Sequence, residues 1–435
     1  MPLKPIKPLL LALLAACALP GPAGAEDLLQ VYAQARTADP LLAGAVARRG
    51  VQRELAAQAA AALLPQWSLS HSEIRYQGDG GREQRSASSL KQVLLDLGKL
   101  EQWSAERSLV SAEEARVQAA EQALCARVAS AYFGVLSAQA ALRNAEANEA
   151  ALAQQVQQAQ KRFKAGLSAA VDVEQARTYH QLSRGASIQA QESLADARQA
   201  LAEITGQQPG TLQALAADLQ AQAPDPQARE AWVARALQAN PALRAQDLTL
   251  QSSEQRIKAA GAAHLPTISL GVDSMRRQGS ALVPADAGRQ LTQVGLQLNI
   301  PLFAGGATES AKRQAVYQRD AAREQLEAAR RALVRETEGQ YQAVRASMAL
   351  LQSTEAAVQA ANQALASTRA GQALGTRGMT DLLLAIQSQT AAQGAHEQAR
   401  HRYVLATLLL QQAAGQLGEA TLATVNQLLQ SKGES

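Results

Sequence analysis

The chain has 435 residues, of which only 3% are aromatic, and a formal net charge of +4 at pH 7. Positive and negative residues are interspersed and form no basic patch, which excludes a nucleic-acid partner. Abundant alanine and glutamine favour closely packed helices over a core of bulky side chains.

The first 25 residues have the organisation of a secretory signal peptide. Lys4 and Lys7 precede an apolar run at residues 9–19, and the small-residue site Ala23-Gly24-Ala25 follows it. We therefore predict cleavage after Ala25 and export of the chain from the cytoplasm. No later segment has the 18 or so continuous apolar residues that a membrane-spanning helix needs.

A second processing signal overlaps the first. The segment Leu14-Ala15-Ala16-Cys17 has the form of a lipoprotein signal, in which Cys17 would be lipidated. The sequence leaves both routes open, and both export the chain. Cleavage after Ala25 would leave Cys125 as the only thiol, so an intrachain disulfide could not form.

An internal duplication accounts for the length of the chain. The segments around Pro40 and Pro65 reappear around Pro241 and Pro266, both 201 residues further on. Four other pairs share an offset of 209: Tyr132 and Tyr341, Gly166 and Gly375, Asp172 and Asp381, and Gly206 and Gly415. We infer two tandem copies of one unit, residues 26–205 and 227–418, with a linker at 206–226 and a C-terminal tail at 419–435.

Each copy is predicted to contain a helix, two strands, a very long helix, a tight turn and a final helix. In the second copy, residues 267–275 and 292–303 alternate apolar and polar side chains, whereas the first copy shows a weaker alternation at about 66–76 and 87–97. Turns at 164–168 and 373–378 fold the long helices back on themselves. The predicted fold class is mixed α+β, dominated by long helical hairpins.

The longest predicted helix has the pattern of a coiled-coil partner. No proline interrupts residues 307–372, so this helix could reach roughly 100 Å. Val344, Leu351, Val358 and Leu365 recur every seven residues, the spacing that keeps one stripe facing a neighbouring helix. A compact globular core needs no such helix.

Strands of about ten residues with one apolar face have the size of strands in an outer-membrane β-barrel. A small soluble sheet is the alternative on this pattern alone. Four strands leave two open edges, whereas the smallest transmembrane barrels have about eight strands. We therefore expect several chains to pool their strands in one barrel.

Several segments carry a resemblance to the TolC family of outer-membrane efflux and secretion channels. They are Glu26–Tyr32, the Leu-Pro strand openings at Pro65 and Pro266, Ala131–Leu136, and the two turns Arg162–Asp172 and Leu374–Asp381. The resemblance covers nearly all the mature chain. It implies a homotrimer in the outer-membrane lipid of a Gram-negative bacterium. Each protomer would give four strands to a shared transmembrane β-barrel, which a helical tunnel continues into the periplasm inside a belt formed by the linker and tail.

In this family the hairpin turns form the periplasmic entrance. A periplasmic adaptor, also called a membrane fusion protein, docks there and connects the channel to an inner-membrane transporter of the ABC or proton-driven class. The resemblance places the docking tips at Gly166, Leu167, Ser168, Gly375, Thr376 and Arg377. The glycines suit the left-handed backbone of a sharp turn, and Ser168 or Thr376 could cap the helix that follows.

The resemblance also implies a gate just beyond the turns, formed by Asp381, Leu384, Arg377, Asp172 and Gln372. Three copies of Asp381 would surround the axis as a ring of carboxylates that attracts cations. Asp172 and Arg377 would link inner and outer helices in the closed state. Gln372 stands where the best-known members have a tyrosine among the links. Leu384 replaces a second acid, so a single Asp ring and weaker cation trapping are expected.

No catalytic site, metal or cofactor is expected. His396 and His401 are five residues apart where a zinc-protease helix needs four, and no phosphate-binding loop or nucleophile elbow is present. Two non-enzymatic classes remain. One is an outer-membrane exit duct for a tripartite efflux pump or a type I protein secretion system, with its cargo left open. The alternative is a periplasmic coiled-coil adaptor or scaffold outside the membrane, which would not need apolar-sided strand pairs.

Overall fold

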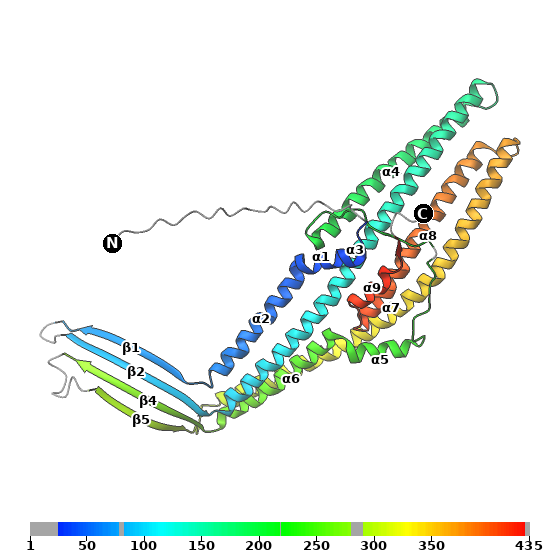
Figure 1. Cartoon of the computed structure of the whole chain (residues 1–435). Helices are drawn as coiled ribbons and strands as arrows, with labels where there is room; N and C mark the ends of the chain where they lie inside the picture. The colour runs from blue at the N-terminus through cyan, green and yellow to red at the C-terminus, as the bar shows by residue number, and fades with distance from the viewer. Residues whose placement is uncertain (1–24, 78–81, 218, 280–289, 431–435) are drawn as a thin grey trace, which may run out of the picture.

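The computed structural model describes residues 25–77, 82–217, 219–279 and 290–430. The chain has one four-stranded sheet and two long helical hairpins. In Figure 1 the sheet lies at one end of an elongated molecule, the hairpins project at the other end, and long helices connect them. Each copy of the repeat contributes two strands and one hairpin. The mixed α+β fold predicted from the sequence is confirmed.

The two copies begin with the same helical corner. In the first copy α1 (Leu28–Ala38) turns into α2 (Pro40–Ala61), and Asp39 at the corner accepts a hydrogen bond from the backbone N of Leu42 at 2.8 Å. In the second copy α5 (Arg229–Ala239) turns into α6 (Pro241–Gly261), and Asn240 takes the same capping position. Each proline stands in the first turn of its helix. A backbone N–H at this position has no acceptor within the helix, so its absence in proline costs no hydrogen bond.

The remaining elements follow in the same order in each copy. The first copy continues with β1 (Gln66–Arg75), β2 (Arg82–Leu95), α3 (Leu97–Lys164) and α4 (Ala170–Thr205). The second continues with the short turn η1 (Ala262–His264), β4 (Thr267–Gln278), β5 (Gln290–Asn299), α7 (Ala307–Ala373) and α8 (Met379–Ala413).

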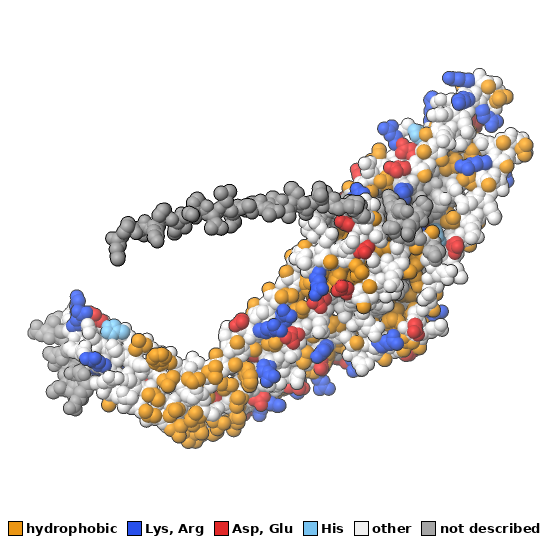
Figure 2. Space-filling model, in the orientation of Figure 1, with side chains coloured by type: hydrophobic (Ala, Val, Ile, Leu, Met, Phe, Trp, Pro, Cys, Tyr) orange, Lys and Arg blue, Asp and Glu red, His pale blue; other side chains and the backbone are white. Residues whose placement is uncertain are grey.

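The four strands form one antiparallel sheet in the order β1-β2-β4-β5, so the β2–β4 pair joins the two copies. Ile268 pairs with Leu298, Leu270 with Leu296, and Val272 with Val294, which makes an apolar ladder on one face. The intervening pairs, such as Ser269 with Gln297, are polar or glycine and lie on the other face. Figure 2 shows apolar side chains gathered where the strands meet the helices.

Several strand ends differ from the prediction. β2 ends at Leu95 instead of 97 because Asp96 caps α3 and accepts a hydrogen bond from the backbone N of Lys99 at 3.0 Å. β5 ends at Asn299 instead of 303 because Pro301 has no N–H to donate to a ladder. β2 also starts at 82 instead of 87, and β4 runs to 278 instead of 275. These extensions are polar residues that carry no alternating pattern.

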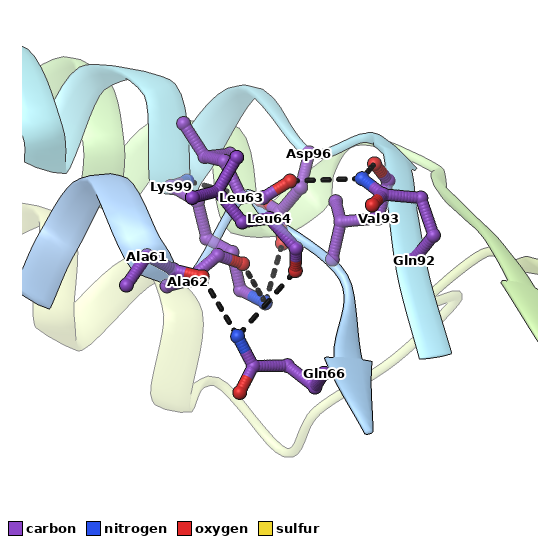
Figure 3. A network of polar contacts seen from close by, with 9 residues as sticks. All are labelled: Ala61, Ala62, Leu63, Leu64, Gln66, Gln92, Val93, Asp96 and Lys99. Atoms are coloured by element: carbon purple, nitrogen blue, oxygen red, sulfur yellow. Dashed lines mark hydrogen bonds and ion pairs between the residues drawn. The ribbon is translucent and has the colours of Figure 1, made fainter. Parts of the chain in front are cut away.

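Side chains of the strands close the joint between sheet and helices (Figure 3). The Nε2 of Gln66 donates to the carbonyl of Ala61, and the Nε2 of Gln92 donates to the carbonyl of Leu63, both at 2.8 Å. These carbonyls lie at the end of α2, where backbone oxygens have no partner within the helix. The joint is therefore held by hydrogen bonds as well as by apolar packing.

The long helices pack lengthwise. α3 packs along α4 and α6, α7 packs along α8 and α6, and α3 also contacts α8, so the two hairpins are neighbours. Of the predicted seven-residue stripe on α7, Val344, Leu351 and Leu365 are buried and Val358 is half-buried. Among the described helices, none is both long enough and apolar enough to cross a membrane.

The linker and the tail come together midway along the helices. β3 (Ala214–Leu215) pairs with β6 (Leu429–Gln430), next to α9 (Glu419–Asn426). We call the described residues of the linker (206–226) and of the tail (419–430) the belt. Tyrosines of the long helices bind its backbone, as when the hydroxyl of Tyr132 donates to the carbonyl of Gln213 at 2.8 Å and that of Tyr403 to the carbonyl of Gln222 at 3.0 Å.

Candidate functional site at the hairpin tips

Both hairpins turn with the same backbone geometry. In the first, Gly166 has φ +70° and the N of Leu167 donates to the carbonyl of Arg162 at 2.8 Å. In the second, Gly375 has φ +77° and the N of Thr376 donates to the carbonyl of Gly371 at 2.9 Å. The positive φ is one that glycine adopts without a steric penalty, so both predicted turn glycines have a physical reason to be there.

The outermost apolar side chains of the tips are in solvent. Leu167 is 70% exposed and Leu374 is 81% exposed. Basic residues of the last turn of α3, Lys161, Arg162 and Lys164, surround the first tip. Single exposed leucines at the ends of two parallel hairpins suit contact with another protein.

The predicted serine and threonine caps are wrong. α4 is capped by Ala169 without any side-chain hydrogen bond. The hydroxyl of Thr376 donates backward to the carbonyl of Gly371 at 3.0 Å and does not reach α8. Instead the carboxylate of Asp381 accepts a hydrogen bond from the N of Gly378 at 3.2 Å, so an acid in the first turn supplies the missing acceptor.

Asp381 and Leu384 lie on one exposed face of α8. They are three residues apart, and Leu384 is 51% exposed. Between them Leu382 and Leu383 point the other way, into an apolar cluster at the tip that includes residues of α3, α4 and α7. The structure therefore leaves the two predicted gate residues free to face something outside this chain.

The predicted link residues do not bind one another within the chain. Arg377 is exposed, and its side chain lies against Gly371, where an added Cβ would stand 2.7 Å from the Cγ of Arg377. Gln372 points its Nε2 toward the Sδ of Met379 at 3.6 Å. Asp172 is half-buried in the first turn of α4. Among the described residues no ion pair includes Asp172, Arg377 or Asp381.

One connection between the hairpins was missed in the sequence. The hydroxyl of Thr380 on α8 donates to the Oε1 of Gln175 on α4 at 2.9 Å. The duplication gives no hint of it, because the residue that corresponds to Thr380 in the first copy is Val171. Thr380 lies next to Asp381, so this bond joins the two hairpins beside the exposed face. Within the described residues, no cluster of histidine, cysteine or acidic side chains could hold a metal ion.

The chain is similar to known outer-membrane proteins along nearly its whole length. The family described as outer membrane efflux protein matches residues 31–207 and 232–416, one segment in each copy. The outer membrane protein TolC of Vibrio cholerae is 32% identical over 92% of this chain and 93% of that protein. The alkaline protease secretion protein AprF of Pseudomonas aeruginosa is 27% identical over 92% of this chain and 87% of that protein.

Solved structures share the architecture. A structure of CusC, described in connection with transmembrane channel formation, superposes with a TM-score of 0.79 at 21% identity. The superposition covers 92% of this chain and 95% of the CusC chain. At this identity the similarity establishes the fold.

Proposed function

The chain belongs to the outer membrane efflux protein family, the family of TolC, and from this membership we propose that three copies assemble into one channel-tunnel. The protein is an outer-membrane efflux or secretion channel that extends into the periplasm. It is a transport protein and not an enzyme, and the alternative of a periplasmic adaptor outside the membrane is wrong.

The open edges of the sheet carry the proposal of a trimer. β1 and β5 are the outer strands of the described sheet, and each pairs on one side only. An open edge in lipid would leave backbone N–H and carbonyl groups without partners, which costs several kcal/mol per group. Pairing β5 of one protomer with β1 of the next satisfies these groups, and three protomers, the number that the family resemblance implies, would close one barrel.

The test is assembly and conductance of the purified chain. We expect it to float with outer membranes, to run as a trimer on gels until boiled, and to form a conducting pore in planar bilayers. A stable monomer without conductance would contradict the trimeric channel.

For the gate we propose a ring of Asp381 carboxylates with Leu384 next to it. The support is their shared exposed face on α8, at the end of the molecule opposite the sheet. Arg377, Asp172 and Gln372 are proposed as links to neighbouring helices in the closed state. Their lack of an ion-pair partner among the described residues of one chain is consistent with bonds between protomers.

For docking we propose that a periplasmic adaptor binds the two tips and connects the duct to an inner-membrane transporter. The tips are Gly166, Leu167, Ser168, Gly375, Thr376 and Arg377, and the exposed Leu167 is the first contact we assign. The duct would serve a tripartite efflux pump or a type I secretion system. The similarity to AprF favours including polypeptides among the cargo classes to be assayed.

Site-specific cross-linking tests the docking proposal. A photoreactive residue at Leu167 should cross-link the adaptor in cells that express the complete transport system. The matched control is Leu182, which is 65% exposed on the same helix pair but lies further from the turn. Equal cross-linking from both positions, or none from Leu167, would contradict docking at the tip.

A further inference from the structure

Two arginines stand directly opposite each other in the sheet. Arg85 of β2 and Arg277 of β4 are partners in the antiparallel register, and both side chains are exposed. The ion pair of this region within the described residues joins Arg82 to Glu73 and includes neither of them. Like charges opposite each other on neighbouring strands are destabilising. The sheet therefore holds a repulsive pair at one defined rung.

The arginine pair lies on the polar face of the sheet. Side chains alternate between the two faces along a strand. The apolar ladder contains Val272 of β4, so Arg277, five residues further on, lies on the opposite face, and Arg85 shares that face as its partner. In the proposed barrel the apolar ladder faces lipid, so both arginines face the lumen.

The pair also lies at the end of the sheet away from the helices. Ten residues separate Arg85 from Leu95 at the helical end of β2, and ten separate Arg277 from Thr267 at the helical end of β4. About 9–11 residues of a tilted strand cross the hydrocarbon core of a membrane. Figure 2 shows Lys and Arg side chains gathered at this far end of the sheet. The two arginines are therefore placed at the outer mouth of the lumen.

Acidic residues on the same face are engaged elsewhere. Glu83 accepts a hydrogen bond from the hydroxyl of Tyr76 at 2.8 Å, and Asp273 lies one rung from Lys91.

The residues next to the pair on this face are small or uncharged, namely Ser72, Ala87 and Met275. The Nε of Arg85 donates to the Sδ of Met275 at 3.1 Å, and a thioether is a weak acceptor. The guanidinium groups therefore have space beside them and a demand for stronger acceptors.

We propose that Arg85 and Arg277, two guanidinium groups from each of three protomers, form a ring that binds multivalent oxyanions entering the lumen from outside; this rests on the trimeric channel proposed above. A guanidinium binds a phosphate group through two parallel N–H···O bonds. A ring of like charges around a pore attracts ions of the opposite sign, and a bound anion relieves the repulsion within each pair. The duct then carries opposite charges at its two ends, the arginines at the outer mouth and Asp381 at the hairpins.

Block of the pore by inorganic triphosphate tests the ring. The purified full-length protein is added to one side of a planar bilayer of zwitterionic phosphatidylcholine, in low salt without divalent ions. Charged residues surround the first hairpin tip, so the hairpins stay on the side of addition and the outer mouth opens on the other side. Triphosphate on the outer-mouth side should reduce the current, more strongly at low salt. The same concentration on the hairpin side should have much less effect.

Three variants assign the block to the arginine pair. Arg277→Ser should raise the half-blocking concentration about tenfold or more, the effect of losing hydrogen bonds between charged groups. Arg85→Glu should abolish the block while the sheet stays folded, because opposite charges across two strands attract. The matched control is Arg276→Ser, one residue from Arg277 on the lipid face, which should leave the half-blocking concentration unchanged. The conductance without triphosphate shows that each variant has formed its pore.

The outcomes separate this inference from the channel itself. A conducting pore that triphosphate does not block from the outer-mouth side overturns the ring and leaves the channel standing. Equal loss of block in Arg276→Ser and Arg277→Ser does the same, because the effect would then not depend on the face of the strand. A purified protein that forms no pore overturns both proposals.

Discussion

Gly206 and Gly415, which occupy corresponding positions in the two copies, show how one backbone angle can be shared while the surroundings differ. Both have positive φ, +75° and +72°, at the ends of α4 and α8. An added Cβ at Gly206 would lie 3.3 Å from the Cβ of Ala38. At Gly415 it would lie only 2.6 Å from the carbonyl oxygen of Ala239. In the first copy the end of α4 packs on the corner between α1 and α2. In the second copy the end of α8 packs on the corner between α5 and α6, and this contact is tighter.

Alanine at Gly415 should therefore destabilise the protein by about 2–3 kcal/mol, because a strained backbone angle and a backbone clash add together. Gly206→Ala should cost less, since its contact is a methyl group that can shift. Gly185→Ala is the control, because that helical glycine has nothing within 4 Å and a negative φ, and alanine should be neutral or stabilising there. The measurement is the melting temperature of the protein in detergent, and equal effects of Gly206→Ala and Gly415→Ala would contradict the clash.

His401 is a buried histidine between the two hairpins. Its Nδ1 lies 2.8 Å from the Oγ of Ser137, and its ring packs against Phe133 on α3. Burial lowers its pKa to about 4, opposed by the charge of Glu397 and assisted by Arg400 and Arg143. The folded chain therefore keeps this imidazole neutral at every pH above about 4.

The pH dependence of stability follows from this shift. Above about pH 6.5 the imidazole is neutral in both folded and unfolded chains and contributes no slope. As the pH falls from about 6.5 to about 4, the unfolded chain binds the proton first, so stability should fall by up to about 3 kcal/mol and then level off. His401→Gln should flatten the dependence of the protein's melting temperature on pH in this window. A slope that survives His401→Gln would contradict the assignment.

At the scale of elements, the hydrophobic periodicity and the turn-forming residues of the sequence predicted most of the helices and strands. The alternation of apolar and polar residues around Leu296 identified β5 and its apolar face. The absence of proline from residues 307–372 identified α7 as one long helix. The polar ends of β2 and β4 were missed because their register comes from pairing with a neighbour and not from an apolar pattern. The bond from Thr380 to Gln175 joins residues 205 apart and follows from packing of the two hairpins, which no local pattern encodes.

The apolar ladder of the sheet gives a prediction at the same scale. Leu296 lies in the middle rung, opposite Leu270, with further apolar rungs on both sides. Leu296→Arg should cost about 2–4 kcal/mol if this rung lies near the bilayer midplane, because the guanidinium would face lipid. Gln297→Arg, one residue further on the opposite face, should be tolerated. Folding into lipid vesicles measures both, and equal damage would mean that the two faces are not lipid and lumen.

At the scale of the whole molecule, the two ends do different work. The sheet end has open edges and an apolar face, and in the proposed assembly other protomers complete it. The hairpin end of each protomer is closed by two glycine turns and an apolar cluster. It nevertheless exposes Asp381 and Leu384 side by side. A threefold arrangement would bring three copies of that exposed pair around one axis.

The last prediction concerns this axis, where symmetry multiplies a single charge. Three Asp381 carboxylates should make the resting pore cation-selective and partly blocked by divalent ions, more strongly at low salt because the screening length is then greater. Asp381→Ala should lose both effects, and Leu384→Asp should strengthen the divalent block, since two stacked rings hold a cation better than one. If Arg377 is the proposed link in the closed state, Arg377→Ser should raise conductance with little change in selectivity, because the Asp381 carboxylates stay in place. Single-channel recordings in planar bilayers measure all three, with Asp196→Ala on α4, well away from the turn, as the charge-matched control. If Asp381→Ala leaves selectivity and block unchanged and Leu384→Asp also has no effect, the constriction lies at another level of the tunnel.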